Sequence, residues 1–170
     1  MDRLAELELD AETKALEAPE DHKNELRLWL RLLTCSTLVE TEMRRRLRDQ
    51  FGVTLPRFDL MAQLERAPEG MTLGEVSKRM MVSNGNVTGL VDRLIESGHI
   101  VRNSPASDRR VQIIALTEAG RAEFAGMARQ HEAWIAEMFA GLGVRDIETL
   151  LKTLGKLKAS VQSAVRDGEA

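Results

Sequence analysis

Aromatic residues, proline and cysteine are scarce in this chain of 170 residues, and tyrosine is absent. The chain contains four Phe, two Trp, four Pro and one Cys. The lone Cys35 cannot form an internal disulfide and suits a reducing cytoplasm. No apolar run approaches the ~20 residues that a membrane span requires, and no signal-peptide pattern opens the sequence. We therefore expect a cytoplasmic protein without a membrane partner.

Motifs that carry chemistry are also missing from the sequence. It contains no Gly-rich phosphate loop, HExxH or CxxC, and His22, His99 and His131 are far apart. Catalysis needs polar groups that converge on one point, and no such cluster can be found. We predict that the chain is not an enzyme and has no catalytic residues, no cofactor and no metal. A metal site built from histidines and carboxylates is the alternative.

Charge is distributed unevenly along the chain. The net charge is −3, but residues 1–25 contain nine acidic and three basic side chains, a local balance of −6. The remaining residues therefore carry +3. A local basic face is enough for phosphate contact, because screening acts over about 8–10 Å. We interpret residues 1–25 as a solvated, partly helical acidic arm. The alternative is that this arm repels DNA or covers a partner surface.

Residues 82–98 have a small, polar front end and a back half with apolar residues at helical spacing. Ser83 or Asn84 is a plausible N-cap, since either side-chain oxygen can accept an amide hydrogen bond. Gly98 suits a left-handed helix stop. Small hydrogen-bonding side chains in the first turns are what a recognition helix needs in a major groove about 12 Å wide. An ordinary helix with a polar cap is the alternative.

The flanking segments extend this pattern. Upstream, the sequence predicts a short helix from Thr72 to Met80, with Thr72 and Glu75 at capping-box spacing. The tight turn that follows gives a helix-turn-helix. Downstream, apolar β-branched runs at 100–102 and 111–116 flank a turn-rich loop with two arginines. A helix-turn-helix followed by a hairpin with a basic tip predicts DNA binding.

The chain closely resembles the MarR family of bacterial winged-helix regulators in the run 85–102 and in Asp108-Arg109-Arg110 followed by L-T-E-A-G at 116–120. The resemblance covers roughly residues 26–165. It implies a mainly α fold with a small β-hairpin wing, in which helices from both chain ends form a homodimer. The expected partners are a second copy of the chain and double-stranded palindromic DNA.

Two helical patterns support the expected dimer. The helix at 26–51 is apolar on more than one face, which is normal for a helix buried between two bodies. A narrow apolar stripe from Ile147 to Val165 recurs near heptad spacing and is a packing seam for another helix. We therefore expect an arm at 1–25, a MarR-type regulator at 26–165 and a tail at 166–170. Within the regulator, dimerisation helices occupy 26–51 and 117–165, and the winged helix-turn-helix lobe occupies 54–116.

DNA-contacting roles follow from position and resemblance. Side chains in the first turns of the 82–98 helix should reach base edges or phosphates: Ser83, Asn84, Asn86 and Thr88. Gly85 would permit close approach, and Arg93 should touch phosphate or brace the wing. The resemblance implies that Asp108 and Arg110 pair to hold the wing's shape while Arg109 enters the minor groove, where a narrow A·T-rich tract attracts it. Thr72 and Lys78 are expected phosphate-backbone contacts.

The resemblance also implies a small-molecule effector bound between the first helices and the DNA-binding lobe. The runs 26–36, 44–48 and 55–64 look most like the branch that governs aromatic-acid catabolism, which includes sensors of aromatic acyl-CoA thioesters. We expect a repressor that an aromatic acyl-CoA thioester or a phenolic acid releases from its operator. The pocket would have an apolar floor (Trp29, Leu33, Phe58, Met61) and a cationic mouth (Arg31, Arg44, Arg45, Arg46, Arg48, Arg57). The alternative for the arginines is a solvated helix end.

Two further readings of the function stay open. One is a regulator that responds to oxidation of Cys35. The absence of tyrosine favours a buried structural cysteine instead, because the resemblance implies that tyrosine hydroxyls stabilise the thiolate in the peroxide-sensing branch. The other is a helical protein-interaction dimer that does not bind DNA.

Overall fold

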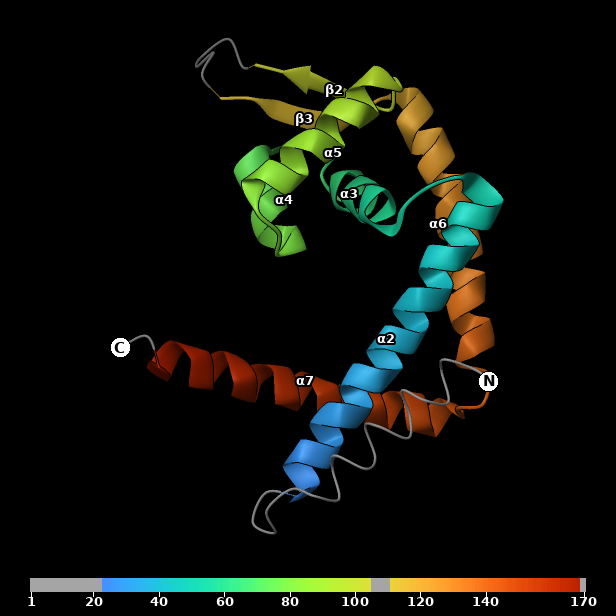
Figure 1. Ribbon diagram of the computed structural model, residues 1–170, viewed down its shortest axis with the longest axis vertical. Coiled ribbons are helices and arrows are strands. Elements are labelled where there is room, and N and C mark those ends of the chain that lie inside the picture. Colours follow the sequence, from blue (N-terminus) through green and yellow to red (C-terminus); the bar gives the residue numbers. More distant parts are fainter. Residues whose placement is uncertain (1–22, 105–110, 169–170) are drawn as a thin grey trace. The chain divides into compact units, whose positions relative to one another are not determined.

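The computed structural model describes residues 23–104 and 111–168 (Figure 1). The chain divides after His131 into two compact units, and α6 crosses the division. None of the helices in the described ranges combines the length and apolar character needed to cross a membrane. The elements are α2 (Lys23–Phe51), α3 (Leu55–Glu65), β1 (Met71–Thr72), α4 (Leu73–Met80), α5 (Asn84–Glu96), β2 (Ile100–Asn103), β3 (Ile113–Leu116), α6 (Glu118–Met138) and α7 (Val144–Gly168).

The fold is mainly helical with one small antiparallel sheet, as the sequence predicts. The sheet order is β1-β3-β2, with Met71 opposite Ile114 and Ile100 opposite Leu116. Strand β1 was not predicted from the sequence, because two residues are too few to show alternation. The second hairpin strand begins at Ile113 rather than at Val111.

Capping residues and a glycine near the helix ends set the helix boundaries. Thr54 is the N-cap of α3, and Pro56 lies in its first turn, where a missing N–H costs nothing. Gly98 takes the left-handed conformation that ends α5, with φ of 74°. Thr117 caps α6, because its Oγ1 accepts the Gly120 N–H at 3.0 Å. The predicted helix stop at Gly98 is confirmed.

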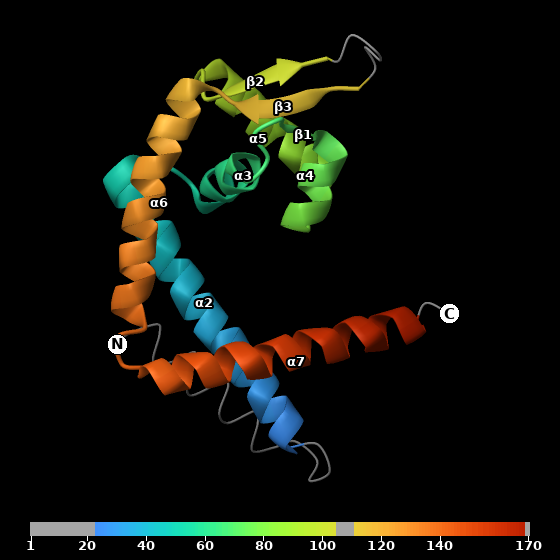
Figure 2. The same ribbon diagram turned by 180° about the vertical axis from the view of Figure 1, so that it is seen from behind.

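The core of the first unit lies between the sheet and helices α3, α4 and α5. Figures 1 and 2 show these three helices gathered on one side of the β2–β3 hairpin. Each element contributes side chains that are almost fully buried: Leu60, Met61 and Leu64 from α3, Val76 from α4, Val87, Val91 and Leu94 from α5, and Ile114 and Leu116 from β3. This packing fixes α5 by its apolar face and leaves its polar face outward.

Helix α2 has a different environment along its length. Met43 and Leu47, in its second half, are buried, whereas Trp29 and Leu33 are 58% and 47% exposed. Cys35 is exposed as well. The interpretation of Cys35 as a buried cysteine is therefore wrong for the single chain, in which other side chains of the first half of α2 are exposed as well.

The second unit is dominated by α7. The helix begins at Val144, and the Asp146 carboxylate accepts the preceding Gly143 N–H at 2.9 Å. The stripe expected from the sequence is present and uncovered in the single chain. Its exposed members are Ile147, Leu150, Leu151, Leu154, Val161 and Val165.

Candidate nucleic-acid interface

The first turns of α5 present small polar groups to solvent. Asn86 and Thr88 are exposed, while Val87 between them is 1% exposed. Ser83 is the N-cap in an extended conformation, but its hydroxyl makes no hydrogen bond to the helix. The N-cap position is thus confirmed, and the expected side-chain cap at Ser83 is wrong. The side chain of Asn84 lies outside the part of the chain that the structure describes. The first turns of α5 therefore present exposed polar side chains to solvent, with the exposed Gly85 among them. The buried apolar face of the same helix holds them in place.

Helix α4 is held by its own cap and by the turn that follows. The Glu75 N–H donates to Thr72 Oγ1 at 3.3 Å, and Glu75 Oε2 accepts the Thr72 N–H at 2.8 Å. These hydrogen bonds from Thr72 hold the pKa of Glu75 below its usual value. Met81 then takes a left-handed conformation with φ of 55°, and the nearby Ser77 hydroxyl donates to the Val82 carbonyl at 2.5 Å. The capping box is confirmed, and Thr72 is engaged with its own helix.

Three cations lie exposed on the helix-turn-helix: Lys78 and Arg79 in the last turn of α4, and Arg93 on α5. Arg93 donates from Nε to the Gly89 carbonyl of its own helix at 3.1 Å. The Nη atoms of a guanidinium held through Nε can still donate hydrogen bonds to a phosphate. The three charges would supply the sequence-independent attraction that DNA binding requires.

A different residue ties α5 to the wing. Arg102 on β2 donates from Nη2 to Asp92 Oδ1 of α5 at 2.7 Å. The role of bracing the wing, expected as an alternative for Arg93, thus belongs to Arg102 and Asp92, which were not predicted. The signal was present in the sequence as opposite charges ten positions apart on consecutive elements. The wing residues Asp108, Arg109 and Arg110 lie outside the described residues.

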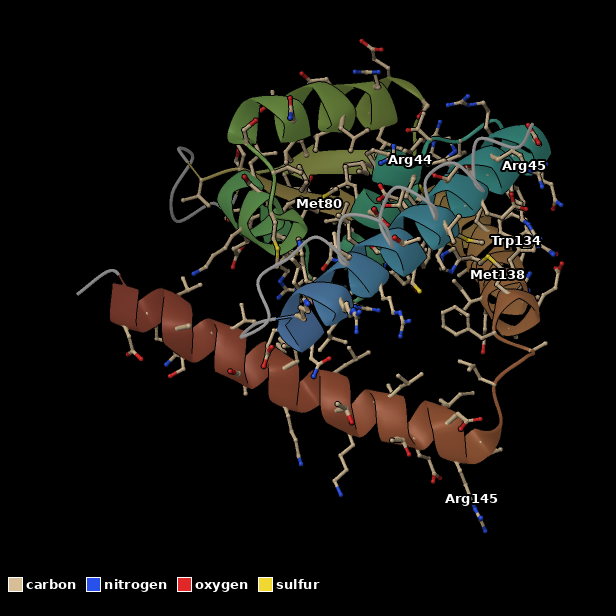
Figure 3. All side chains as sticks on the ribbon, turned by 60° about the horizontal axis from the view of Figure 1, so that its bottom comes forward. Arg44, Arg45, Met80, Trp134, Met138 and Arg145 are labelled. Atoms are coloured by element: carbon tan, nitrogen blue, oxygen red, sulfur yellow. The ribbon has the colours of Figure 1, made fainter. Side chains whose placement is uncertain are left out.

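The arginines expected to form a cationic mouth are largely matched by carboxylates on α2 itself. Arg44 pairs with Glu40, and Arg45 contacts both Glu42 and Asp49. Arg46 pairs with Glu42 at 2.5 Å. Hydrogen bonds from Arg45 and then Arg46 lower the pKa of Glu42 from 4.5 to about 2. Figure 3 shows the Arg44 and Arg45 side chains on α2.

The surroundings of Arg44 are acidic rather than anion-accepting. The pKa of Asp59 is raised, first by partial burial of its carboxyl group and then by the negative charge of the nearby Glu40. The positive charge of Arg44 lowers this pKa in part. An anionic ligand at Arg44 would therefore meet two carboxylates. Among the arginines expected at the mouth, Arg31 and Arg48 make no ion pair with the described residues, so these two of that set are best placed to receive an anion.

The apolar residues expected to form the pocket floor fall into two groups. Trp29 and Leu33 are exposed on α2, whereas Phe58 and Met61 are buried in the core of the lobe at 6% and 0% exposure. The Phe58 ring stacks on His131 with centroids 4.7 Å apart, and burial lowers the pKa of His131. Arg57 pairs with Glu123 and lies against His99. Phe58 and Met61 thus serve the core in the single chain, and a ligand would reach them only after local movement.

Known proteins share both the sequence pattern and the geometry. A family model described as MarR family matches residues 51–111. The crystal structure of a MarR family transcriptional regulator from Silicibacter pomeroyi is 35% identical, covers 85% of this chain and 99% of its own, and has a TM-score of 0.71. The chain belongs to the MarR family. This MarR-type chain is accordingly a DNA-binding transcriptional regulator and not an enzyme.

Two further relatives bear on what the MarR-type chain does. The transcriptional activatory protein BadR of Rhodopseudomonas palustris is 29% identical over 147 residues, which are 81% of this chain and 83% of BadR. FabT of Streptococcus pneumoniae, solved in complex with DNA, is 26% identical, covers 81% of this chain and 97% of its own, and has a TM-score of 0.69. These similarities disfavour the alternative of a helical interaction dimer that does not bind DNA.

Proposed function

We propose that this MarR-type regulator binds a palindromic operator as a homodimer, with α5 in the major groove and the wing in the adjacent minor groove. The observation that carries the proposal is the division of α5 into a buried apolar face and an exposed front of small polar residues. Asn86 and Thr88 can donate or accept hydrogen bonds at base edges. Arg109 at the wing tip is the minor-groove residue, and Lys78, Arg79 and Arg93 contact phosphates.

The second copy is recruited by α7 and the first half of α2. Ile147, Leu150 and Leu154 present an apolar stripe that a single chain leaves in water. Burying such residues stabilises by about 25 cal/mol for each Å² of apolar surface removed from water. A two-fold dimer presents two copies of α5, and a palindromic site mirrors that symmetry. The dimer is thus the unit that binds DNA.

We expect Arg109→Ala to weaken binding to the preferred duplex by roughly 1–3 kcal/mol, since a groove contact of that size is lost. Asn86→Ala should weaken binding by a comparable amount and relax the base preference at one position in each half-site. Arg145→Ala is the matched control, because it removes the same charge from α7. The measurement is fluorescence anisotropy with a duplex that the protein selects from a random library, at constant salt.

Each outcome of that experiment has a clear meaning. If Arg109→Ala and Asn86→Ala bind as tightly as the parent, α5 and the wing do not read DNA and the proposal fails. If Arg145→Ala weakens binding as much as Arg109→Ala does, the effect is one of overall charge and not of groove contact.

The effector we propose is an aromatic molecule with an anionic group, either a phenolic acid or an aromatic acyl-CoA thioester. The branch resemblance supports the aromatic part. The ion pairs of Arg44, Arg45 and Arg46 weaken the case for a thioester, whose several phosphates need several available cations. Arg31 and Arg48 are enough for a single carboxylate. A ligand that holds the two copies of α5 at a spacing different from that of successive major grooves would release the DNA.

The effector is found by titrating the protein–DNA complex with p-coumaroyl-, feruloyl- and benzoyl-CoA beside their free acids. We expect a free acid to release the duplex and Arg48→Ala to raise the concentration that is needed. To shift the population decisively, the ligand must prefer the released state by several kcal/mol. Release by thioesters alone would show that the α2 ion pairs open. Release by peroxide, abolished in Cys35→Ser, would instead support the thiol-responsive alternative, for which the exposed Cys35 is accessible.

Repression is the regulatory outcome we propose, through occupation of the promoter in the absence of ligand. Activation is the second candidate, because BadR is a transcriptional activatory protein. In vitro transcription from a promoter that carries the selected duplex separates the two. A transcript that falls when the protein is added supports repression, and a transcript that rises supports activation.

A further inference from the structure

The C-terminal end of α5 is fastened to the start of α6 by a compact set of contacts, which we call the α5–α6 joint. It comprises Gly98, His99, Thr117, Gly120 and Glu123, together with Arg57 of α3. We propose that Glu123 is a positioning residue for DNA recognition: through His99 and Arg57 it sets the orientation of α5 relative to the first part of α6. The inference rests on the proposed role of α5 as the DNA-reading helix.

The backbone part of the joint leaves little room for adjustment. The Thr117 N–H donates to the His99 carbonyl at 3.0 Å, and Thr117 Oγ1 donates to the Gly98 carbonyl at 2.7 Å. The Cα of Gly120 lies so close to the same peptide that an added Cβ would be 2.1 Å from the His99 oxygen. His99 is therefore held at its main chain, immediately after the residue that ends α5.

The side-chain part of the joint adds a charged group from α6. His99 Nε2 contacts Glu123 Oε2, and Arg57 Nη2 lies 3.5 Å from Glu123 Oε1 and 3.2 Å from His99 Nδ1. The side chains of His99, Arg57 and Glu123 are 20%, 25% and 31% exposed, so water screens them only in part. One carboxylate thus joins α3, the end of α5 and α6.

The contacts also assign the proton on His99. A guanidinium can only donate hydrogen bonds, so the Nδ1 that faces Arg57 acts as an acceptor. A neutral imidazole then carries its hydrogen on Nε2, which faces Glu123. The Ser97 hydroxyl, 2.7 Å from Nδ1 and 3.2 Å from the Leu94 carbonyl oxygen, has one hydrogen that it can donate to either acceptor. Glu123 is therefore the group that selects this tautomer and the orientation of the ring.

Small changes at the joint are magnified at the other end of α5. The helix has 13 residues. At 1.5 Å per residue it is roughly 20 Å long, so a tilt of about 5° at its C-terminal end displaces its front by roughly 2 Å. Hydrogen bonds to base edges tolerate only a few tenths of an ångström. Loss of Glu123 should therefore impair sequence-specific contacts, whereas non-specific attraction to phosphate should persist.

A second ion pair, between α3 and α6, provides the matched control. Arg121 on α6 lies 3.9 Å from Glu65 on α3, and both side chains are about 40% exposed. This pair does not include the end of α5. Glu65→Gln removes one carboxylate, as Glu123→Gln does, without disturbing the joint.

The test compares the parent with Glu123→Gln, Glu123→Ala and Glu65→Gln, using the full chain. The affinity is measured for the selected duplex and for a scrambled duplex of equal length. We expect Glu123→Ala to weaken specific binding about tenfold, the equivalent of about 1.4 kcal/mol, and non-specific binding less than about twofold. Glu123→Gln keeps an acceptor for the His99 N–H and should lose less, and Glu65→Gln should match the parent. Nitrogen-15 NMR of the His99 ring should show the Nε2–H tautomer in the parent, with less of it in Glu123→Ala.

Three results would overturn the inference. One is unchanged specific binding in both Glu123 variants while Asn86→Ala weakens it, which leaves α5 as the reader but removes Glu123 from its positioning. Another is equal loss of specific and non-specific binding with a lowered melting temperature, which marks a purely structural role. The third is a parent His99 with its hydrogen on Nδ1. If Asn86→Ala has no effect on specific binding, the proposed function fails first, and the inference fails with it.

Discussion

Gly120→Ala is expected to lower the free energy of unfolding by about 3 kcal/mol, the largest single-residue stability effect we predict. The new Cβ would lie 2.1 Å from the His99 carbonyl oxygen and 3.0 Å from its carbonyl carbon. Both are backbone atoms of the α5–α6 joint, so no side chain can rotate away to make room. Thermal unfolding should show a melting temperature lower by roughly 6–12 °C.

Gly126→Ala is the control for that experiment, because Gly126 also lies in α6 and a Cβ there would meet nothing within 4 Å. Alanine is the better helix former, so this variant should gain about 0.5–1 kcal/mol. If both variants are stabilised, the close approach of Gly120 to His99 does not exist in solution. If both are destabilised, α6 is sensitive to any added side chain.

The double substitution Leu150→Glu and Leu154→Glu is expected to abolish the dimer, and specific DNA binding with it. Both leucines are on the α7 stripe and are 45% and 41% exposed in the single chain, so the fold of one chain does not depend on their burial. Two glutamates per copy would place four carboxylates in the proposed seam, where burying an unpaired charge is costly. Affinity for the selected duplex should fall about 10³-fold or more, toward non-specific binding.

Light scattering and anisotropy measure the two effects in one series. Thr149→Glu, which by helical spacing faces away from the stripe, adds the same charge to α7 and should remain dimeric. A double variant that stays dimeric would show that the stripe is not the seam. A monomeric variant that still binds the selected duplex at parental affinity would show that a single α5 is enough for recognition.

Interactions between residues close in the sequence allowed the ends and the order of the helices and strands to be predicted. The capping box of Thr72 and Glu75 depends on residues three positions apart, and the stop at Gly98 depends on the backbone freedom of a single residue. Such interactions leave a mark in the sequence because their spacing is fixed by helix geometry. For the same reason the order helix, turn, helix, hairpin could be read before any coordinate was known.

Contacts between distant residues could not be read in the same way. His99 and Glu123 are 24 positions apart, and Arg57 lies 42 positions before His99. No periodicity relates such positions, so only the folded chain shows that they meet. The ion pairs of the α2 arginines are a different case. Glu40, Glu42 and Asp49 stand three or four positions from their partners, the spacing at which opposite charges meet on a helix, so this neutralisation could have been predicted from the sequence and was missed.

The division of the chain after His131 also has a consequence for folding. The almost fully buried apolar side chains from Met43 to Met127 precede that division, and Trp134 is the buried apolar residue among the described ones that follows it. Domains generally fold as units, N-terminal first. We therefore expect the lobe that carries α5 to fold as its own unit, separately from α7, the helix proposed to form the dimer.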